Sequence, residues 1–327
     1  MLKDDTLRLL LSTDAPLSGQ AMSRELKVSR AAIWKAVEAL RSEGYQIEAL
    51  PSRGYRLTAS PDVLSPGALA RPGQAVGNTV ICLERVDSTN DECRRRAASG
   101  SPSGLVVLAG EQTGGKGRRG RTFQSLPGKG LYLSALLRPQ VTLAQVSQLT
   151  AWTAVAVCRA LKALTGLICD IKWPNDILLG GKKLCGILTE LGLEGETGAL
   201  DHVVVGIGIN VSQREGDFGP ELSPIATSLA QHMAAPPLRV QVASALLDQL
   251  EALWNGFPQQ KGEYLAEYRQ RCITIGREVK LIRPSGDTLA QATAVNDDFS
   301  LQVLLPDGTQ ETISAGEVSV RGLLGYT

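Results

Sequence analysis

Hydrophobic positions in the first sixty residues follow helical spacing and then change to strand-like alternation. Within residues 29–42 the apolar side chains recur at i, i+3, i+4 and i+7, after Ser29 as a candidate N-cap and before Gly44 as a stop. Two shorter helical patterns precede this segment, and residues 45–57 alternate on both sides of a Pro-Ser-Arg-Gly turn, which is typical of a hairpin. Three helices followed by a hairpin predict a winged helix-turn-helix domain over residues 1–63.

A Pro-, Ser- and Gly-rich stretch at 58–73 leads into a region where strand and helix patterns mix. These patterns predict strands at 78–86, 105–112, 130–139, 169–179, 182–194 and 202–211, and helices at 143–164, 240–257 and 262–272. We expect a central domain over residues 64–272 that contains a mixed sheet covered by helices. Residues 273–327 carry five short strand patterns between Gly and Pro turns, which predicts an SH3-like small β-barrel. The fold class is therefore α+β.

Composition excludes several classes of protein. Of the 327 residues, 43% are hydrophobic and 20% are charged, which excludes disorder over most of the length. The net charge of +1 excludes a strongly basic chain, so any contact with nucleic acid must come from a local patch. No apolar run reaches the roughly 18 residues that a membrane helix needs, and the N-terminus does not resemble a signal peptide.

The six cysteines form no C-x-x-C pair, and the chain contains only two histidines. A zinc site or a disulfide scaffold is therefore not expected. Several cysteines lie in apolar runs, which predicts buried free thiols in a reducing compartment. We expect a cytoplasmic protein with no membrane segment and no metal held by a dedicated set of side chains.

Residues 114–121, GGKGRRGR, are the densest candidate for chemistry. Their glycines match the dinucleotide pattern G-x-G-x-x-G, but a strand pattern follows where that fold needs a helix. Residues 110–116 match most of a phosphate-binding P-loop, but Gly117 replaces the Ser or Thr that binds magnesium. A kinase loop is excluded because neither of the two histidines precedes Arg-Asp, so the chain has no H-R-D motif.

Two interpretations of this loop remain. It is either a flexible basic surface turn or a cradle whose backbone N–H groups and cationic side chains surround an anion. Four cations packed together without counter-charge repel one another, which favours an anionic ligand.

Three other polar segments could meet this loop. Residues 87–90 join a strand to a helix, where they form either an ordinary N-cap or a ligand-binding edge. Residues 172–176 place a cation, an amide and a carboxylate around a proline, and residues 182–187 begin a strand with two lysines, which could also be a solvated turn. Residues 206–210 end a buried strand with two glycines that would let a ligand lie against the backbone.

The motifs DSTN, GKGRRGR, KWPND, KKLCGIL and GIGIN, in this order, resemble the biotin–protein ligase family. Residues 29–57 resemble the winged helix of the bifunctional members, which also repress the biotin operon, and residues 313–322 resemble the C-terminal domain of the family. The resemblance implies a class II synthetase-like ligase domain. It also implies that ATP and biotin form biotinyl-5′-AMP, that magnesium accompanies ATP, and that biotin passes to a lysine of the carrier domain of acetyl-CoA carboxylase.

The resemblance also implies roles for individual residues. Arg118 and Lys183 match the catalytic cations, which would neutralise the biotin carboxylate and the α-phosphate. The positions matching biotin contacts are Ser88, Thr89, Asn90, Gln112, Lys116, Gly117, Arg118, Lys183, Gly186 and Gly206. The positions matching the nucleotide side are Arg118, Arg119, Arg121, Phe123, Asn175, Asp176 and Asn210.

This chain differs from the family pattern at three places. Lys116 stands where many relatives have Arg, and Phe123 stands where relatives often have Trp. The expected first hairpin of the C-terminal domain, within residues 290–303, lacks glycine.

The winged helix would act as a repressor on biotin operon DNA. Its charge is modest, +2 over residues 1–58 from nine basic and seven acidic residues, so we expect a ligand-dependent homodimer to bind the operator. The expected DNA contacts are Ser18, Gln20, Ser29, Arg30, Lys35 and Arg53. Two other hypotheses remain: a DNA-binding sensor without ligase activity, and a lipoate or octanoate ligase of the same architecture.

Overall fold

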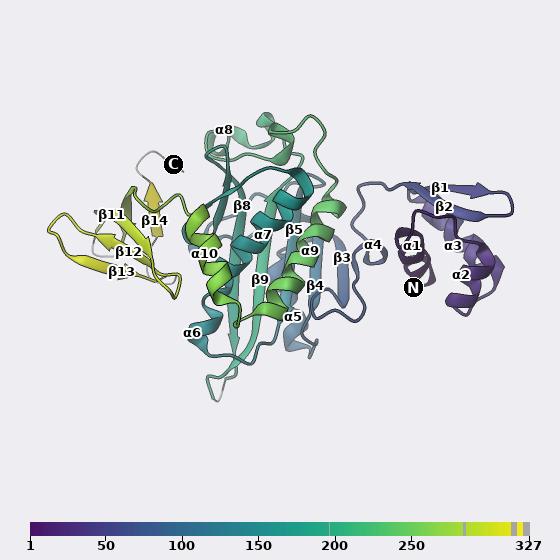
Figure 1. Cartoon of the computed structure of the whole chain (residues 1–327), viewed down its shortest axis with the longest axis horizontal. Coiled ribbons are helices and arrows are strands. Elements are labelled where there is room, and N and C mark those ends of the chain that lie inside the picture. The colour runs from purple at the N-terminus through teal and green to yellow at the C-terminus, as the bar shows by residue number, and fades with distance from the viewer. Residues whose placement is uncertain (196, 284–285, 315–318, 323–327) are drawn as a thin grey trace.

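The computed structural model describes residues 1–327 except 196, 284–285, 315–318 and 323–327. The chain forms three regions in a row, with the N-terminal helices and hairpin at one end, the large sheet in the middle and the C-terminal strands at the other end (Figure 1). Within the described residues, no helix is long and apolar enough to span a bilayer.

The N-terminal region is the predicted winged helix-turn-helix. Its elements are α1 (Leu2–Leu11), α2 (Gly19–Glu25), α3 (Arg30–Ser42), β1 (Gln46–Leu50) and β2 (Gly54–Ala59). Ser29 caps α3 as predicted, since its hydroxyl accepts the Ala32 N–H, and Ser18 caps α2 in the same way. The apolar face of α3 packs with α1 and the hairpin into a core separate from that of the rest of the chain.

The short helix α4 (Pro66–Leu69) follows the hairpin and packs against both α1 and the central region. Its Gly67 lies so close to α1 that an added Cβ would be 2.8 Å from the Asp4 Cα, so the linker is held tightly at this point. A second attachment joins Asp62 to Arg239, with 2.7 Å between the carboxylate and the guanidinium.

The central region is a seven-stranded sheet in the order β3-β4-β5-β9-β8-β7-β6. Its strands are β3 (Thr79–Val86), β4 (Leu105–Gln112), β5 (Gly130–Leu137), β6 (Asp170–Lys172), β7 (Asp176–Leu179), β8 (Lys182–Leu193) and β9 (Leu200–Asn210). The β3–β4 pair is parallel and the other neighbouring pairs are antiparallel.

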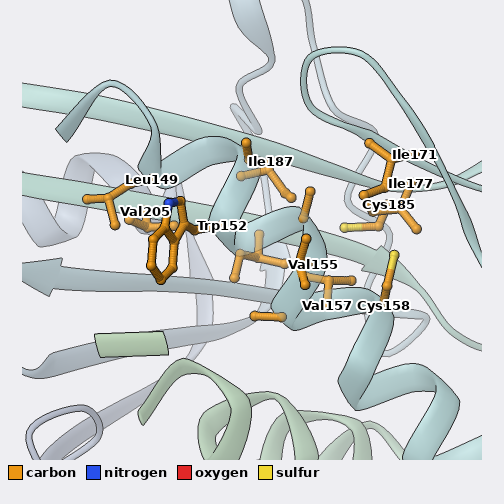
Figure 2. Packing of buried hydrophobic residues seen from close by; sticks show 14 of the residues in the cluster. Leu149, Trp152, Val155, Val157, Cys158, Ile171, Ile177, Cys185, Ile187 and Val205 are labelled. Atoms are coloured by element: carbon orange, nitrogen blue, oxygen red, sulfur yellow. The ribbon is translucent and has the colours of Figure 1, made fainter. Parts of the chain in front are cut away.

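Helices cover both faces of this sheet. They are α5 (Thr89–Ala98), α6 (Leu143–Val146), α7 (Leu149–Thr165), α9 (Arg239–Gly256) and α10 (Lys261–Arg271), whereas α8 (Gly219–Leu222) is a single turn without buried residues. On one face, Trp152, Val155 and Cys158 of α7 pack with Cys185 and Val205 and their neighbours (Figure 2). On the other face, α5 packs against alternate residues of β4, β5 and β9.

Two element predictions were wrong in this region. The single helix expected at 143–164 is two helices: the capping box of Thr142 and Gln145 begins a one-turn α6, and α7 starts separately at buried Leu149. The single strand expected at 169–179 is the hairpin β6–β7, because the chain reverses at Pro174 and pairs Lys172 with Asp176.

The C-terminal region is a five-stranded antiparallel sheet in the order β13-β12-β11-β10-β14. Its strands are β10 (Glu278–Ile282), β11 (Thr288–Val295), β12 (Leu301–Leu304), β13 (Gln310–Ile313) and β14 (Ser319–Gly322). Part of the last predicted strand motif, residues 315–318, lies outside the described residues. The β11–β12 turn places Phe299 at φ +65°, where a glycine would be expected, and buries its ring against Tyr268 with 5.5 Å between ring centroids.

Candidate active site

A cavity of about 630 Å³ opens over β8 and β9 and is bounded by the segments that the motifs singled out. All the residues predicted to contact biotin or nucleotide line this cavity, except Asn210. Asn210 is buried beyond it, where its amide donates to the Thr227 carbonyl at 2.9 Å and its carbonyl accepts from Gln213 at 3.1 Å. The candidate site is therefore one continuous pocket assembled from five separate motifs.

One part of the cavity lining is polar and uncharged. Ser88 caps α5 by accepting the Asp91 N–H, so the predicted N-cap and the predicted ligand edge are the same residue. Thr89 and Asn90 follow on the first turn and are both buried. Gln112, at the end of β4, accepts from the Thr89 N–H at 2.8 Å. These side chains form a hydrogen-bonding wall with no formal charge.

A second part of the lining is cationic. Among the described residues that line the cavity, the one carboxylate is that of Asp176. The six cationic side chains are Lys116, Arg118, Arg119, Arg121, Lys172 and Lys183. Lys183 lies 2.6 Å from Asp176, and Arg118 donates to the Asn175 side chain at 3.4 Å. Burial lowers the pKa of Arg118 from its usual value. This excess of partly buried positive charge is suited to a polyanion.

The glycine-rich loop is a narrow hairpin. Gly117 N–H donates to the Arg121 carbonyl at 2.7 Å, and Phe123 N–H donates to the Gly115 carbonyl at 2.9 Å. Arg119 has φ +57°, a left-handed conformation that is strained for a side-chain-bearing residue. Lys116 Nζ lies 2.7 Å from Asp91, so its side chain ties the loop to α5.

Glycines in β8 and β9 form the floor of the cavity. A Cβ added at Gly206 would lie 2.1 Å from Asn90 Oδ1, and one at Gly208 would lie 2.6 Å from the Phe123 ring. Phe123 also approaches Gly186, so its ring lies over the bare backbone of both strands. The motif glycines are needed for close contact with neighbouring side chains.

The sequence alone did not identify several lining residues. Lys172 is 9% exposed and Trp173 is 2% exposed, and both belong to the KWPND segment, in which the family resemblance implies roles only for Asn175 and Asp176. Leu222 and Ile225 come from a segment without a motif and are brought in because Ile225 accepts the Lys183 backbone N–H at 2.8 Å. The alternation of apolar residues in β8 and β9 could have predicted two further apolar lining residues, Ile187 and Ile207.

In the N-terminal region the six predicted DNA contacts divide into two groups. The hydroxyls of Ser18 and Ser29 are used as helix caps. The other four side chains are exposed: Gln20, Arg30, Lys35 and Arg53. Trp34, also on α3, is 54% exposed. No group of three or more His, Cys, Asp or Glu residues that could hold a metal occurs among the described residues.

Comparisons with known proteins agree with this geometry. Residues 82–210 match the biotin/lipoate A/B protein ligase family, residues 3–56 match an HTH domain, and residues 274–321 match the biotin protein ligase C terminal domain. Together these domains define a protein ligase joined to a helix-turn-helix domain.

The chain is 35% identical over 306 residues to the bifunctional ligase/repressor BirA of Bacillus subtilis, covering 91% of this chain and 92% of that protein. It is 31% identical over 325 residues to the protein of the same name in Escherichia coli, covering 98% and 99%. It also resembles the structure of biotin protein ligase from Aquifex aeolicus in complex with biotin and ATP, with 30% identity, a TM-score of 0.64, and coverage of 75% of this chain and 99% of that one. The chain belongs to the biotin protein ligase family.

Proposed function

We propose that this protein uses ATP to activate biotin as biotinyl-5′-AMP and transfers the biotinyl group to a lysine of the carrier domain of acetyl-CoA carboxylase. The observation that carries this proposal is the polarity of the cavity, which is uncharged at α5 and strongly cationic at the loop and β8. A ligand with a neutral polar head and a carboxylate tail fits this arrangement when a polyphosphate meets its tail. Biotin and ATP have these properties.

The chemistry follows from the charges. The biotin carboxylate must attack the α-phosphorus of ATP, which brings two anions together and expels diphosphate. Arg118 and Lys183 would neutralise both groups, and the loop N–H groups would add fixed dipoles. The neutral amine of the carrier lysine then attacks the carbonyl carbon of the mixed anhydride, releases AMP and loses a proton to form the amide.

Two groups of side chains would divide the ligands between them. The wall on α5 and β4, together with Lys116, Gly117, Gly186 and Gly206, would surround the biotin head and its chain. Arg119, Arg121, Phe123, Asn175 and Asp176 would contact the nucleotide, with the Phe123 ring as an apolar cover. Asn210 would act indirectly, by holding the segment at Thr227.

Magnesium is expected to arrive with ATP. The residues fit such an ion, because magnesium bound to nucleotides takes one or two carboxylates and otherwise phosphate oxygens and water. Asp176 is the carboxylate that lines the cavity. It would hold the ion near the phosphates, where the ion would neutralise their charge.

We further propose that residues 1–63 form a DNA-binding domain that represses the biotin operon in the cytoplasm as a ligand-dependent homodimer, with 64–272 as catalytic domain and 273–327 as C-terminal domain. The separate N-terminal core and the exposed Arg30 and Lys35 on α3 support this proposal. Helix α3 would enter the major groove, and Arg53 in the wing would lie near phosphate. A single module of this size offers little surface, so two copies would act together.

The ligase proposal is tested by replacing Lys183. Lys183→Ala should raise the activation free energy of adenylate formation, measured in a single turnover, by about 2–4 kcal/mol, because a contact that stabilises the transition state is lost. Lys182→Ala is the matched control, because Lys182 is adjacent but donates to the Ser223 carbonyl at 3.0 Å and does not line the cavity. Equal rates in the two variants would remove Lys183 from the chemistry.

The repressor proposal is tested by a band-shift titration on DNA upstream of the biotin synthesis genes, with and without biotin plus ATP. We expect a ligand-dependent shift and a loss of binding in Arg30→Ala. No ligand-dependent shift at micromolar protein would contradict repression and leave the ligase proposal intact. The alternative of a sensor without ligase activity is disfavoured because Arg118 and Lys183 both line the cavity.

A further inference from the structure

Behind the uncharged wall of the cavity lies a chain of buried and partly buried hydrogen bonds, two members of which, Ser134 and Glu190, have no direct part in the proposed reaction. It begins at Glu190 on β8, whose carboxylate accepts from Asn90 Nδ2 at 2.7 Å, while the Leu188 carbonyl accepts from the same nitrogen at 3.3 Å. Carboxylate and carbonyl oxygens can only accept, so the Asn90 amide nitrogen must face β8. Asn90 Oδ1 is therefore fixed on the opposite side. Arg94 lies 3.4 Å from Glu190 and supplies the counter-charge.

Ser134 on β5 is the next member of the chain and is fully buried. Its hydroxyl oxygen lies 2.6 Å from Asn90 Oδ1 and 2.7 Å from Thr89 Oγ1. A hydroxyl has one proton to donate, and Asn90 Oδ1 can only accept. Ser134 therefore donates to Asn90, and its oxygen is left to accept from Thr89.

Thr89 has a second acceptor nearby. Gln112 Oε1 lies 3.0 Å from Thr89 Oγ1 and also accepts the Thr89 backbone N–H, while Gln112 Nε2 donates to Ser125 Oγ at 2.8 Å. These contacts fix the Gln112 amide with its oxygen towards Thr89. The Thr89 proton goes to Ser134, because that contact is the shorter of the two and Gln112 Oε1 already accepts the Thr89 backbone N–H, so the proton is not available to the cavity. Thr89 therefore offers an oxygen lone pair to the ligand.

Unlike the hydroxyl of Thr89, the hydroxyl of Ser88 can act as a hydrogen-bond donor towards the cavity. Its oxygen accepts the Asp91 N–H at the start of α5, and no hydrogen bond among the described residues uses its proton. Ser88 can therefore donate into the cavity beside Thr89, which accepts. An adjacent donor and acceptor are complementary to a ligand in which a carbonyl oxygen stands next to an N–H group.

We propose that Ser134 and Glu190 are positioning residues that set the hydrogen-bonding polarity of Thr89 and Asn90, so that the cavity selects a cyclic urea over a ring or chain without N–H groups. This inference rests on the proposed binding of biotin in this cavity. A site built to accept an N–H rejects ligands that lack it, because its buried acceptor would lose a partner. The buried chain would thus contribute to discrimination between biotin and lipoate or octanoate.

Calorimetric titration of the full-length protein with biotin and with two biotin analogues, each methylated at one ureido nitrogen, tests this role. In the wild type, methylation at the nitrogen that faces Thr89 should weaken binding more than methylation at the other. Ser134→Ala should weaken the binding of biotin by about 10- to 100-fold. It should also reduce the difference in affinity between the two methylated analogues. The adenylation rate at saturating biotin should stay near wild type, because Ser134 does not line the cavity.

Thr153→Val is the matched control. Thr153 is another buried hydroxyl, but it donates to the Leu149 carbonyl within α7, so its loss should not change the affinity for either analogue. Should Ser134→Ala fail to fold, Glu190→Ala at the partly exposed end of the chain gives the same readout with a smaller loss of affinity. An unchanged biotin affinity, or an unchanged difference between the analogues, would overturn the positioning role. Failure of the wild type to bind biotin at all would instead overturn the proposed function.

Discussion

The two ends of the chain are attached to the catalytic region in different ways. The N-terminal region has its own core and is joined through α4 and the Asp62–Arg239 pair. The C-terminal sheet shares one continuous core with the catalytic region, and its Phe299 carbonyl accepts from the Trp173 indole N–H at 2.9 Å. The N-terminal region is therefore a separable module, whereas the C-terminal sheet packs against the catalytic region and stabilises it; we call this sheet the brace.

The brace reaches the active site. Trp173 and Pro174 line the cavity, and the Tyr268 hydroxyl donates to the Pro174 carbonyl at 3.2 Å while the Tyr268 ring meets Phe299. The Trp173 backbone N–H donates to the Thr274 hydroxyl at 3.0 Å. The turn that presents Asn175 and Asp176 is therefore held from the C-terminal side. We expect damage there to affect catalysis as well as stability.

The largest effect is expected from Phe299→Ala. Removing this buried ring should lower the free energy of unfolding by about 3–5 kcal/mol and should slow adenylation by loosening the Trp173 turn. Urea unfolding and diphosphate exchange measure the two effects. Leu289→Ala, on the same sheet but 43% exposed, is the control and should change little. Loss of stability with full activity would show that the sheet does not brace the site.

A smaller effect is expected from Asp62→Ala. This change leaves the Arg239 side chain, 11% exposed, without its carboxylate and removes an acceptor for the Val240 N–H. Because the pair is partly solvated, we expect a loss of about 1–2 kcal/mol at the junction. Limited proteolysis of residues 58–65 should become faster.

Asp297→Ala is the control at the other junction. Its ion pair with Arg269 is largely exposed, with Asp297 at 84%, so it should contribute little. Equal proteolysis of residues 58–65 in the two variants would contradict a specific role for Asp62.

The smallest effect on catalysis is expected from removing residues 1–63. Since this region has a separate core, the shortened protein should exchange diphosphate within about threefold of the full chain, which is below about 1 kcal/mol. DNA binding should be lost completely. Loss of exchange in a folded, shortened protein would show that the N-terminal region is part of the catalytic unit.

Short-range patterns carried most of the prediction from sequence. The caps at Ser18 and Ser29 follow local rules, and the motif residues of the cavity are recognisable because glycines and cations recur at fixed spacing. Leu222 and Ile225 could not be predicted, because their segment reaches the cavity through the long-range pairing of Ile225 with Lys183. Asn210 was predicted to touch the nucleotide, but its amide is used in contacts that no local pattern reports.

The central claim is that the cavity activates biotin. The most direct test is ATP–diphosphate exchange by the full-length protein with biotin, lipoate and octanoate supplied in turn. We predict that exchange with biotin exceeds exchange with the other two acids by about 100-fold or more. With lipoate or octanoate bound, the polar side chains at α5 would have no hydrogen-bonding partner on the ligand. Equal or faster exchange with lipoate or octanoate would contradict this claim.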